Sequence, residues 1–129
     1  MLLGIKRIKI MNRTIIDGIE CIVLYHGTSA INVTNIMDSP MMKQSLNGLG
    51  FYLTDEVDTA KQYGSKVIAF AMTRETYESI KFVVRTIDLS WSEGLTPYGL
   101  ARTTGIEYVV TTQGGVNALA VECEDTYLV

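Results

Sequence analysis

The chain has little of what usually marks a functional site or a special environment. Its 129 residues include one histidine, two cysteines and two prolines. No Cys/His cluster exists, which excludes a zinc site of the usual kind. No apolar run reaches the about 20 residues that a membrane-spanning helix needs. Positive charge is scarce, because the net charge is −3, and the chain lacks the basic surface typical of nucleic-acid-binding domains.

The composition is that of an ordered protein with one core. Apolar residues make up 47% of the chain and charged residues 19%, and this length suffices for one domain. We therefore expect a single domain over residues 1–129. Cys21 and Cys123 lie in apolar, strand-like runs and are expected to be buried thiols, with a disulfide as the alternative. The first ten residues lack the apolar block and cleavage site of a signal peptide, so we expect a cytoplasmic protein.

Strands dominate the secondary structure that the sequence predicts. Apolar and β-branched runs indicate strands at residues 20–26, 51–54, 66–72, 81–89, 107–112 and 118–122. Capping residues and apolar spacing indicate short helices at residues 29–37, 55–63 and 96–105, and residues 41–49 are expected to form a loop. Because the helices do not alternate regularly with the strands, we expect a mixed α+β fold of packed, mainly antiparallel sheets.

Three short stretches, far apart in the sequence, carry the candidate site. They are residues 24–28 (LYHGT), 48–55 (GLGFYLTD) and 107–110 (EYVV). The first holds the only histidine, and the last places a carboxylate at the head of an apolar strand. In this order they resemble the His-Tyr-Glu signature of ADP-ribosyltransferases of the diphtheria-toxin and poly(ADP-ribose)-polymerase type. The likeness extends from residue 26 to about residue 117.

The resemblance implies both a fold and a reaction. The fold would be ADP-ribosyltransferase-like, with two packed, mainly antiparallel β-sheets and short helices around an NAD cleft. The protein would cleave the nicotinamide–ribose bond of NAD and transfer ADP-ribose to an acceptor macromolecule, expected to be a protein. NAD would be the co-substrate, with no metal, no nucleic acid and no membrane involved. A domain of this size favours mono-ADP-ribosylation, since polymer synthesis needs a second binding site.

The first stretch would bind NAD through His26, Gly27 and Thr28. Gly27 has no Cβ, so a flat ligand could approach its backbone, whose N–H and C=O match the donor and acceptor of the nicotinamide carboxamide. The resemblance implies that His26 contacts a ribose hydroxyl on the adenosine side. Taken alone, a single histidine on an apolar strand is more often a structural residue.

Two tyrosines of the second stretch would hold the nicotinamide ring. Tyr63 follows Tyr52 by eleven positions, the separation that the family uses. An electron-poor nicotinamide ring stacks well on electron-rich phenols, so the two rings could grip it from both sides. The alternative is that both tyrosines fill the core. The chain departs from the family at Ala60, where polymerase-like members commonly have a serine that binds the carboxamide, and Thr59 stands beside it.

Glu107 would be the catalytic carboxylate of the third stretch. The resemblance implies that it accepts a hydrogen bond from the 2′-hydroxyl of the nicotinamide ribose. This would stabilise the positive charge that develops on the ribose as nicotinamide leaves. A carboxylate at the start of a buried strand costs free energy unless it lies in a cleft or is well paired. The alternative is a surface glutamate at a strand edge.

Other functions remain open at the level of sequence. An NAD glycohydrolase would pass ADP-ribose to water, and a catalytically silent module would bind NAD or ADP-ribose without cleaving it. Residues 38–47 are expected to lie beside the site and to help choose the acceptor. Compact single-domain relatives of this type resemble bacterial or phage effectors, an analogy of fold alone. Glu122 and Glu124 form the Glu-x-Glu of the arginine-modifying branch, but its other elements are absent.

Overall fold

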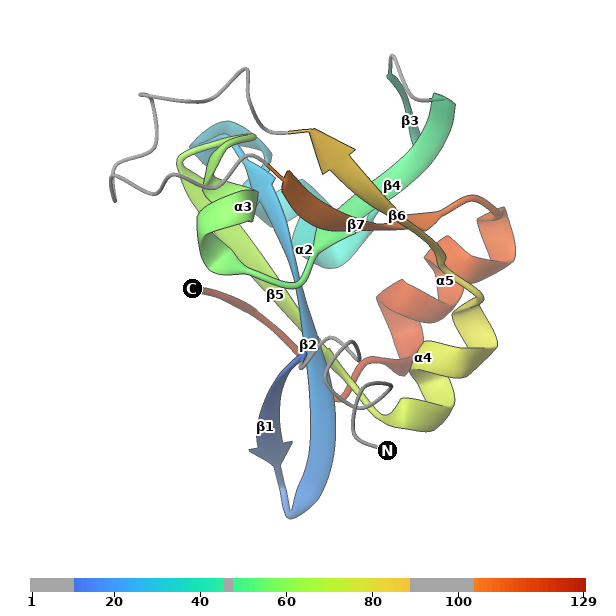
Figure 1. Cartoon of the computed structure of the whole chain (residues 1–129). Helices are drawn as coiled ribbons and strands as arrows, with labels where there is room; N and C mark the ends of the chain where they lie inside the picture. The colour runs from blue at the N-terminus through green and yellow to red at the C-terminus, as the bar shows by residue number, and fades with distance from the viewer. Residues whose placement is uncertain (1–10, 46–47, 89–103) are drawn as a thin grey trace, which may run out of the picture.

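The computed structural model describes residues 11–45, 48–88 and 104–129. Within these residues, eight strands form one antiparallel sheet in the order β6-β7-β4-β2-β5-β8, with β1 paired to β2 and β3 paired to β4 (Figure 1). The strands are β1 (Asn12–Ile16), β2 (Ile19–Thr28), β3 (Lys43–Ser45), β4 (Gly48–Thr54), β5 (Lys66–Met72), β6 (Val83–Asp88), β7 (Thr104–Val110) and β8 (Asp125–Leu128). The helices are η1 (Ala30–Asn32), α2 (Val33–Asp38), α3 (Val57–Lys61), α4 (Arg74–Ile80) and α5 (Gln113–Glu122).

The two central strands, β2 and β5, are buried on both faces, which explains their unbroken apolar runs. Alternate residues of β2 point in opposite directions, so Val23 and Leu24 belong to different core clusters. One cluster includes Leu24, Phe51, Phe70 and Tyr108 and is covered by apolar residues of α2, α4 and α5. The other consists of smaller side chains of β2 and β5 that pack against α3.

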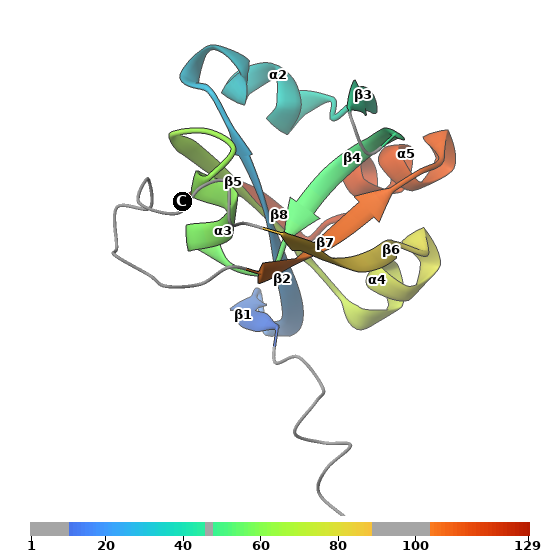
Figure 2. The same ribbon diagram turned by 45° about the horizontal axis from the view of Figure 1, so that its top comes forward.

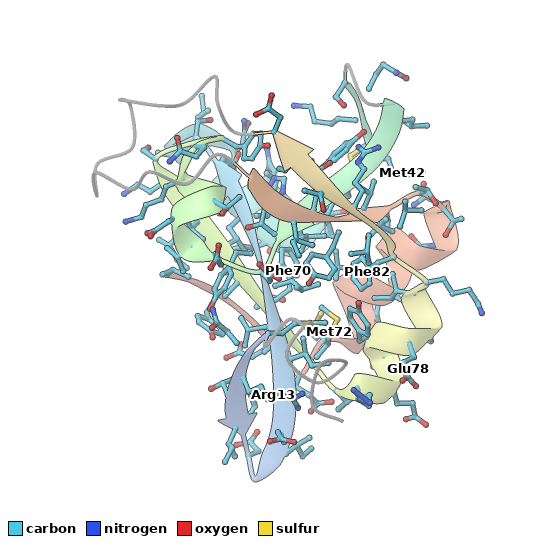
Figure 3. All side chains as sticks on the ribbon, in the orientation of Figure 1. Arg13, Met42, Phe70, Met72, Glu78 and Phe82 are labelled. Atoms are coloured by element: carbon cyan, nitrogen blue, oxygen red, sulfur yellow. The ribbon has the colours of Figure 1, made fainter. Side chains whose placement is uncertain are left out.

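The helices therefore divide between the two faces of the sheet. Figure 2 shows α4 and α5 side by side on one side of the strands and α3 on the other. Phe70, Met72 and Phe82 gather between the sheet and the α4–α5 pair, whereas Glu78 points outward from α4 (Figure 3). Among the described residues, no helix combines the length and the apolarity needed to cross a membrane.

The sheet has two halves that are joined by little backbone pairing. The strands β1, β2, β5 and β8 form one half, and β3, β4, β7 and β6 form the other. A single register pair, Tyr25 with Thr54, joins β2 to β4. We call this junction the seam. The α+β class and the antiparallel arrangement are thus confirmed, but the strands form one continuous sheet and not two separate sheets, because this pair keeps the halves connected.

Most of the predicted elements are present. Strands occur as β2, β4, β5, β6 and β7, and helices occur as η1 with α2 and as α3. The predicted strand at residues 118–122 is wrong, because these residues belong to α5. There Thr112 caps the helix by accepting a hydrogen bond from the Gly115 N–H at 3.0 Å, and Val116 and Leu119 are buried. The predicted helix at residues 96–105 lies mostly outside the described residues, and β7 begins at Thr104.

Two further details differ from the predictions, whereas the cysteines are thiols as expected. The loop expected at residues 41–49 contains the β3–β4 hairpin. Asp55 was expected to cap the following helix, but Glu56 occupies the cap position of α3. Instead, Asp55 is buried and its Oδ2 accepts a hydrogen bond from the Tyr108 hydroxyl at 2.8 Å. Both cysteines are free thiols, with Cys21 buried and Cys123 half-buried.

Candidate active site

The three signature residues come from three strands that are neighbours in the sheet. His26 lies near the end of β2, Tyr52 on β4 and Glu107 on β7. In the register of β4 and β7, Tyr52 is opposite Val109 and Thr54 is opposite Glu107. Strand geometry thus brings the tyrosine and the glutamate onto one face, since residues two apart on a strand share a face.

Glu107 is almost fully buried and is paired with an arginine. Only 3% of the residue is exposed. Arg85, its direct partner across β6 and β7, donates from Nε to Oε1 at 3.0 Å, and Nη2 lies 3.0 Å from the same oxygen. Burial of a carboxylate without a counter-charge is costly, so this pair is what permits a glutamate at the head of the strand. The alternative of an exposed surface glutamate is wrong.

Arg85 also links Glu107 to Tyr52. Its guanidinium carbon lies 5.8 Å from the centre of the Tyr52 ring, within the range of a cation–π contact. Burial lowers the pKa of Arg85, but the hydrogen bond and the negative charge of Glu107, with a smaller contribution from Tyr52, outweigh it and raise the pKa overall. Nη2 is buried and finds no hydrogen-bond acceptor of suitable geometry among the described residues. Its contact with Glu107 Oε1 at 3.0 Å is therefore an ion pair without the geometry of a hydrogen bond.

The hydroxyl of Tyr52 fastens the ring to the β3–β4 hairpin. It donates to the carbonyl oxygen of Gly48 and accepts from Ser45 Oγ at 3.0 Å. Gly48 has φ +106°, a conformation that favours glycine, and it opens β4 directly after the turn. The residues expected to select an acceptor, 38–47, thus include a strand that is in contact with the Tyr52 hydroxyl.

Tyr63 is exposed, and its hydroxyl is influenced by the charges of Glu107 and Arg85. The residue is 47% exposed, so it does not fill the core, and Tyr52 is only partly buried. Burial of the hydroxyl raises the pKa of Tyr63, the negative charge of Glu107 raises it further, and Arg85 opposes both. The alternative that both tyrosines fill the core is wrong.

His26 lies at the seam and faces the opposite side of β4. Its ring stacks on Phe51 with a centroid separation of 4.3 Å, and Phe51 belongs to the core cluster on the α2 side. Nδ1 is 2.7 Å from the carbonyl oxygen of Tyr52. A carbonyl only accepts, so Nδ1 must carry the proton and Nε2 is the acceptor of the neutral ring. Burial lowers the pKa of His26 below 6.5 despite this hydrogen bond, and the charge of Lys43 lowers it further.

Gly27 is required for packing in this structure. A Cβ at this position would lie 1.8 Å from the carbonyl oxygen of Ala60, so β2 and α3 approach each other at the glycine. The expectation that Gly27 leaves room for a flat ligand therefore has a competing cause. Thr28 is buried, at the end of β2. Ala60 is fully buried, and the hydroxyl of the neighbouring Thr59 is directed to Glu56 Oε1 at 3.5 Å.

Arg85 is the residue of the site that sequence reasoning missed. It stands 22 positions before Glu107, and only the β6–β7 register brings the two together. Its signal was an arginine inside a strand of otherwise β-branched and apolar residues (VVRTI), which is unusual unless the charge has a partner. Within the described parts of the chain, no group of three or more His, Cys, Asp or Glu side chains is arranged to hold a metal.

The structure thus brings together a paired carboxylate, the ring of Tyr52 and an arginine on one face of the sheet, and it places the imidazole of His26 on the opposite face. A search with this chain finds no matching family model, no matching curated protein and no matching solved structure.

Proposed function

We propose that this protein is an NAD-dependent mono-ADP-ribosyltransferase with an ADP-ribosyltransferase-like fold. The observation that carries the proposal is that Arg85 contacts both Tyr52 and Glu107, although these two signature residues stand 55 positions apart in the sequence.

The division of NAD between these residues follows from the resemblance alone, because the structure places His26 and Tyr52 on opposite faces of the sheet. The nicotinamide half would lie with the two tyrosines and Glu107, and the adenosine ribose would lie toward His26. The neutral ring that the lowered pKa of His26 favours leaves Nε2 as an acceptor for a ribose hydroxyl. Thus His26 and Tyr52 would serve different ends of one ligand while their strands stay linked by the Nδ1 contact to the Tyr52 carbonyl.

The reaction would proceed by breaking the bond between C1′ of the ribose and the pyridinium nitrogen. The electron pair goes to the nitrogen, so nicotinamide leaves as a neutral molecule without protonation. Glu107 would accept the 2′-hydroxyl hydrogen bond and stabilise the positive charge on the ribose. A nucleophilic atom of the acceptor then bonds to C1′ and gives its proton to solvent. Both contacts of Arg85 fall on Oε1, which directs the ribose contact to Oε2.

The β3–β4 hairpin is where we expect the acceptor to bind. Ser45 of this hairpin contacts the Tyr52 hydroxyl, and Met41 and Lys43 beside it are exposed. An apolar and a cationic side chain next to the reacting centre suit a protein surface better than water alone. This favours a transferase over an NAD glycohydrolase.

One observation favours a second function, a silent module that binds NAD or ADP-ribose. The negative charge of Glu107 is neutralised by Arg85 at 3.0 Å, and the carboxylate is buried. A neutralised carboxylate stabilises a developing cation less than a free one does. Binding without cleavage would then be the result.

The test measures nicotinamide release from NAD by the wild type, by Glu107→Gln and by a control, Glu20→Gln, with and without cell lysate. Glu20 is also a strand glutamate paired with an arginine, but this pair is exposed, so Glu20→Gln should behave as the wild type. Release that depends on Glu107 and labels a protein in the lysate supports the transferase. Release without labelling indicates a glycohydrolase, and NAD binding by calorimetry without release indicates the silent module.

A further inference from the structure

The Arg85–Glu107 pair differs from an ordinary structural ion pair because Arg85 also contacts a second residue of the signature, Tyr52. The guanidinium touches Glu107 through two nitrogens, Nε and Nη2, both 3.0 Å from Oε1. It also lies over the ring of Tyr52. One side chain thus contacts two of the three signature residues, and it comes from a strand, β6, that holds none of them.

The backbone fixes this arrangement more firmly than the side chains alone could. Arg85 and Glu107 are direct partners in the β6–β7 register, and Tyr52 is opposite Val109, two residues further along β7. The three side chains therefore stand on one face of three adjacent strands. The planar guanidinium can hold a carboxylate oxygen through two nitrogens while its face rests on an aromatic ring, which an ammonium group does less well.

We propose that Arg85 is a positioning residue of this site, which holds the Glu107 carboxylate by Oε1 and so turns Oε2 toward the ribose. The inference rests on the proposed function and extends it to a residue outside the His-Tyr-Glu signature. Arg85 acts through Glu107 and Tyr52 and does not itself contact the reacting bond.

The consequence is a kinetic signature. Loss of the guanidinium leaves the Glu107 carboxylate without its partner and free to turn, and a misplacement of about 1 Å costs up to about 100-fold in rate. We expect Arg85→Gln to lower kcat by about 10-fold to 100-fold and to leave KM for NAD within about twofold. Arg85→Lys keeps the charge without the fork and should fall between the wild type and Arg85→Gln.

The experiment measures kcat and KM for nicotinamide release in two backgrounds, wild type and Glu107→Asp. Aspartate keeps a carboxylate but is one methylene too short to keep the contact with Arg85. If Arg85 acts through Glu107, Arg85→Gln causes less than about a twofold further loss in the Glu107→Asp background. Arg13→Gln, which breaks the exposed Arg13–Glu20 pair, is the matched control and should leave both constants unchanged. Circular dichroism at the assay temperature checks that each variant is folded. If Arg85→Gln is unfolded, Arg85→Lys replaces it in both backgrounds.

Three outcomes would overturn the inference. An unchanged kcat in Arg85→Gln would remove any role in the reaction. An equal loss in both backgrounds would mean that Arg85 acts independently of Glu107. A raised KM with an unchanged kcat would make Arg85 a ground-state binding residue. Failure of the proposed function gives a different result, because the wild type and Arg13→Gln would then release no more nicotinamide than Glu107→Gln. In that case the positioning role of Arg85 is overturned as well.

Discussion

The two halves of the sheet use the same kind of strand for different purposes. In the half built on β2 and β5, apolar side chains cover both faces, and α3 seals one face so closely that only glycine fits at position 27. In the half built on β4 and β7, one face joins the core, but the other presents Tyr52, Glu107 and Arg85. If the proposed function holds, the first half is a scaffold and the second half carries the reacting residues.

The largest loss of stability that we predict comes from a substitution in the half built on β2 and β5. Gly27→Ala would place a Cβ 1.8 Å from the Ala60 carbonyl oxygen, and backbone on both sides must move. We expect a loss of about 3 kcal/mol in the free energy of unfolding, at the upper end for overpacking. Urea denaturation measures it.

Gly114→Ala is the matched control, because a Cβ at Gly114 meets nothing within 4 Å and the position is helical. It should stabilise the protein by about 0.5–1 kcal/mol. Equal stabilities for the two variants would contradict the close approach of β2 and α3.

A smaller effect is expected inside the half of the sheet that contains β4 and β7. Tyr108→Phe removes the hydroxyl that donates to Asp55 Oδ2 at 2.8 Å, and both residues are buried. We expect destabilisation by about 1–3 kcal/mol, because a buried carboxylate loses a hydrogen bond that water cannot replace. Thermal unfolding of this variant, compared with Tyr77→Phe from the same aromatic cluster, provides the measurement. The control should change stability by less than about 0.5 kcal/mol.

The sequence predicted the buried strands well because their signal is local. An unbroken apolar run such as KVIAFAM indicates a strand with both faces covered, and β5 has this form. The hairpin of β1 and β2 was missed although its turn, Asp17–Gly18, has positive φ at both residues and Asp-Gly is a strong hairpin signal. The strand predicted at residues 118–122 is wrong because a short apolar run is compatible with a strand and with a helix, and the sequence alone does not distinguish them.

Some residues of the candidate site also have a local sequence signal, and others do not. His26, Tyr52 and Glu107 could be singled out because short motifs surround them. Arg85 could not, since its meaning depends on a strand register that pairs it with Glu107, 22 residues later. The reason for Gly27 was also beyond reach, because the close approach of α3 is a matter of packing and not of local sequence.

The smallest effect is expected at the seam, from the single histidine. Burial favours the neutral form of His26 in the folded protein, so its pKa there lies below the 6.5 of the unfolded chain. The contribution of the neutral ring to the free energy of unfolding is fully present above about pH 6.5. It is lost as the pH falls from 6.5 toward the lower pKa of His26 in the folded protein. The slope cannot exceed about 1.4 kcal/mol per pH unit for one proton.

Urea denaturation between pH 7.5 and 5 compares the wild type with His26→Gln, so that titration of the carboxylates cancels. The wild type should lose more stability than the variant over this interval. A wild type that gains stability relative to His26→Gln as the pH falls would show that the folded protein favours the charged ring, and it would remove Nε2 as an acceptor for ribose.

The initial rate of nicotinamide release from NAD, measured side by side for the wild type, Glu107→Gln and Glu20→Gln, tests the central claim most directly. We expect the wild type and Glu20→Gln to release nicotinamide at the same rate, and Glu107→Gln to be slower by about 100-fold or more. Equal rates for all three proteins would contradict the assignment of the Arg85–Glu107 pair to catalysis and would leave it as a buried structural ion pair.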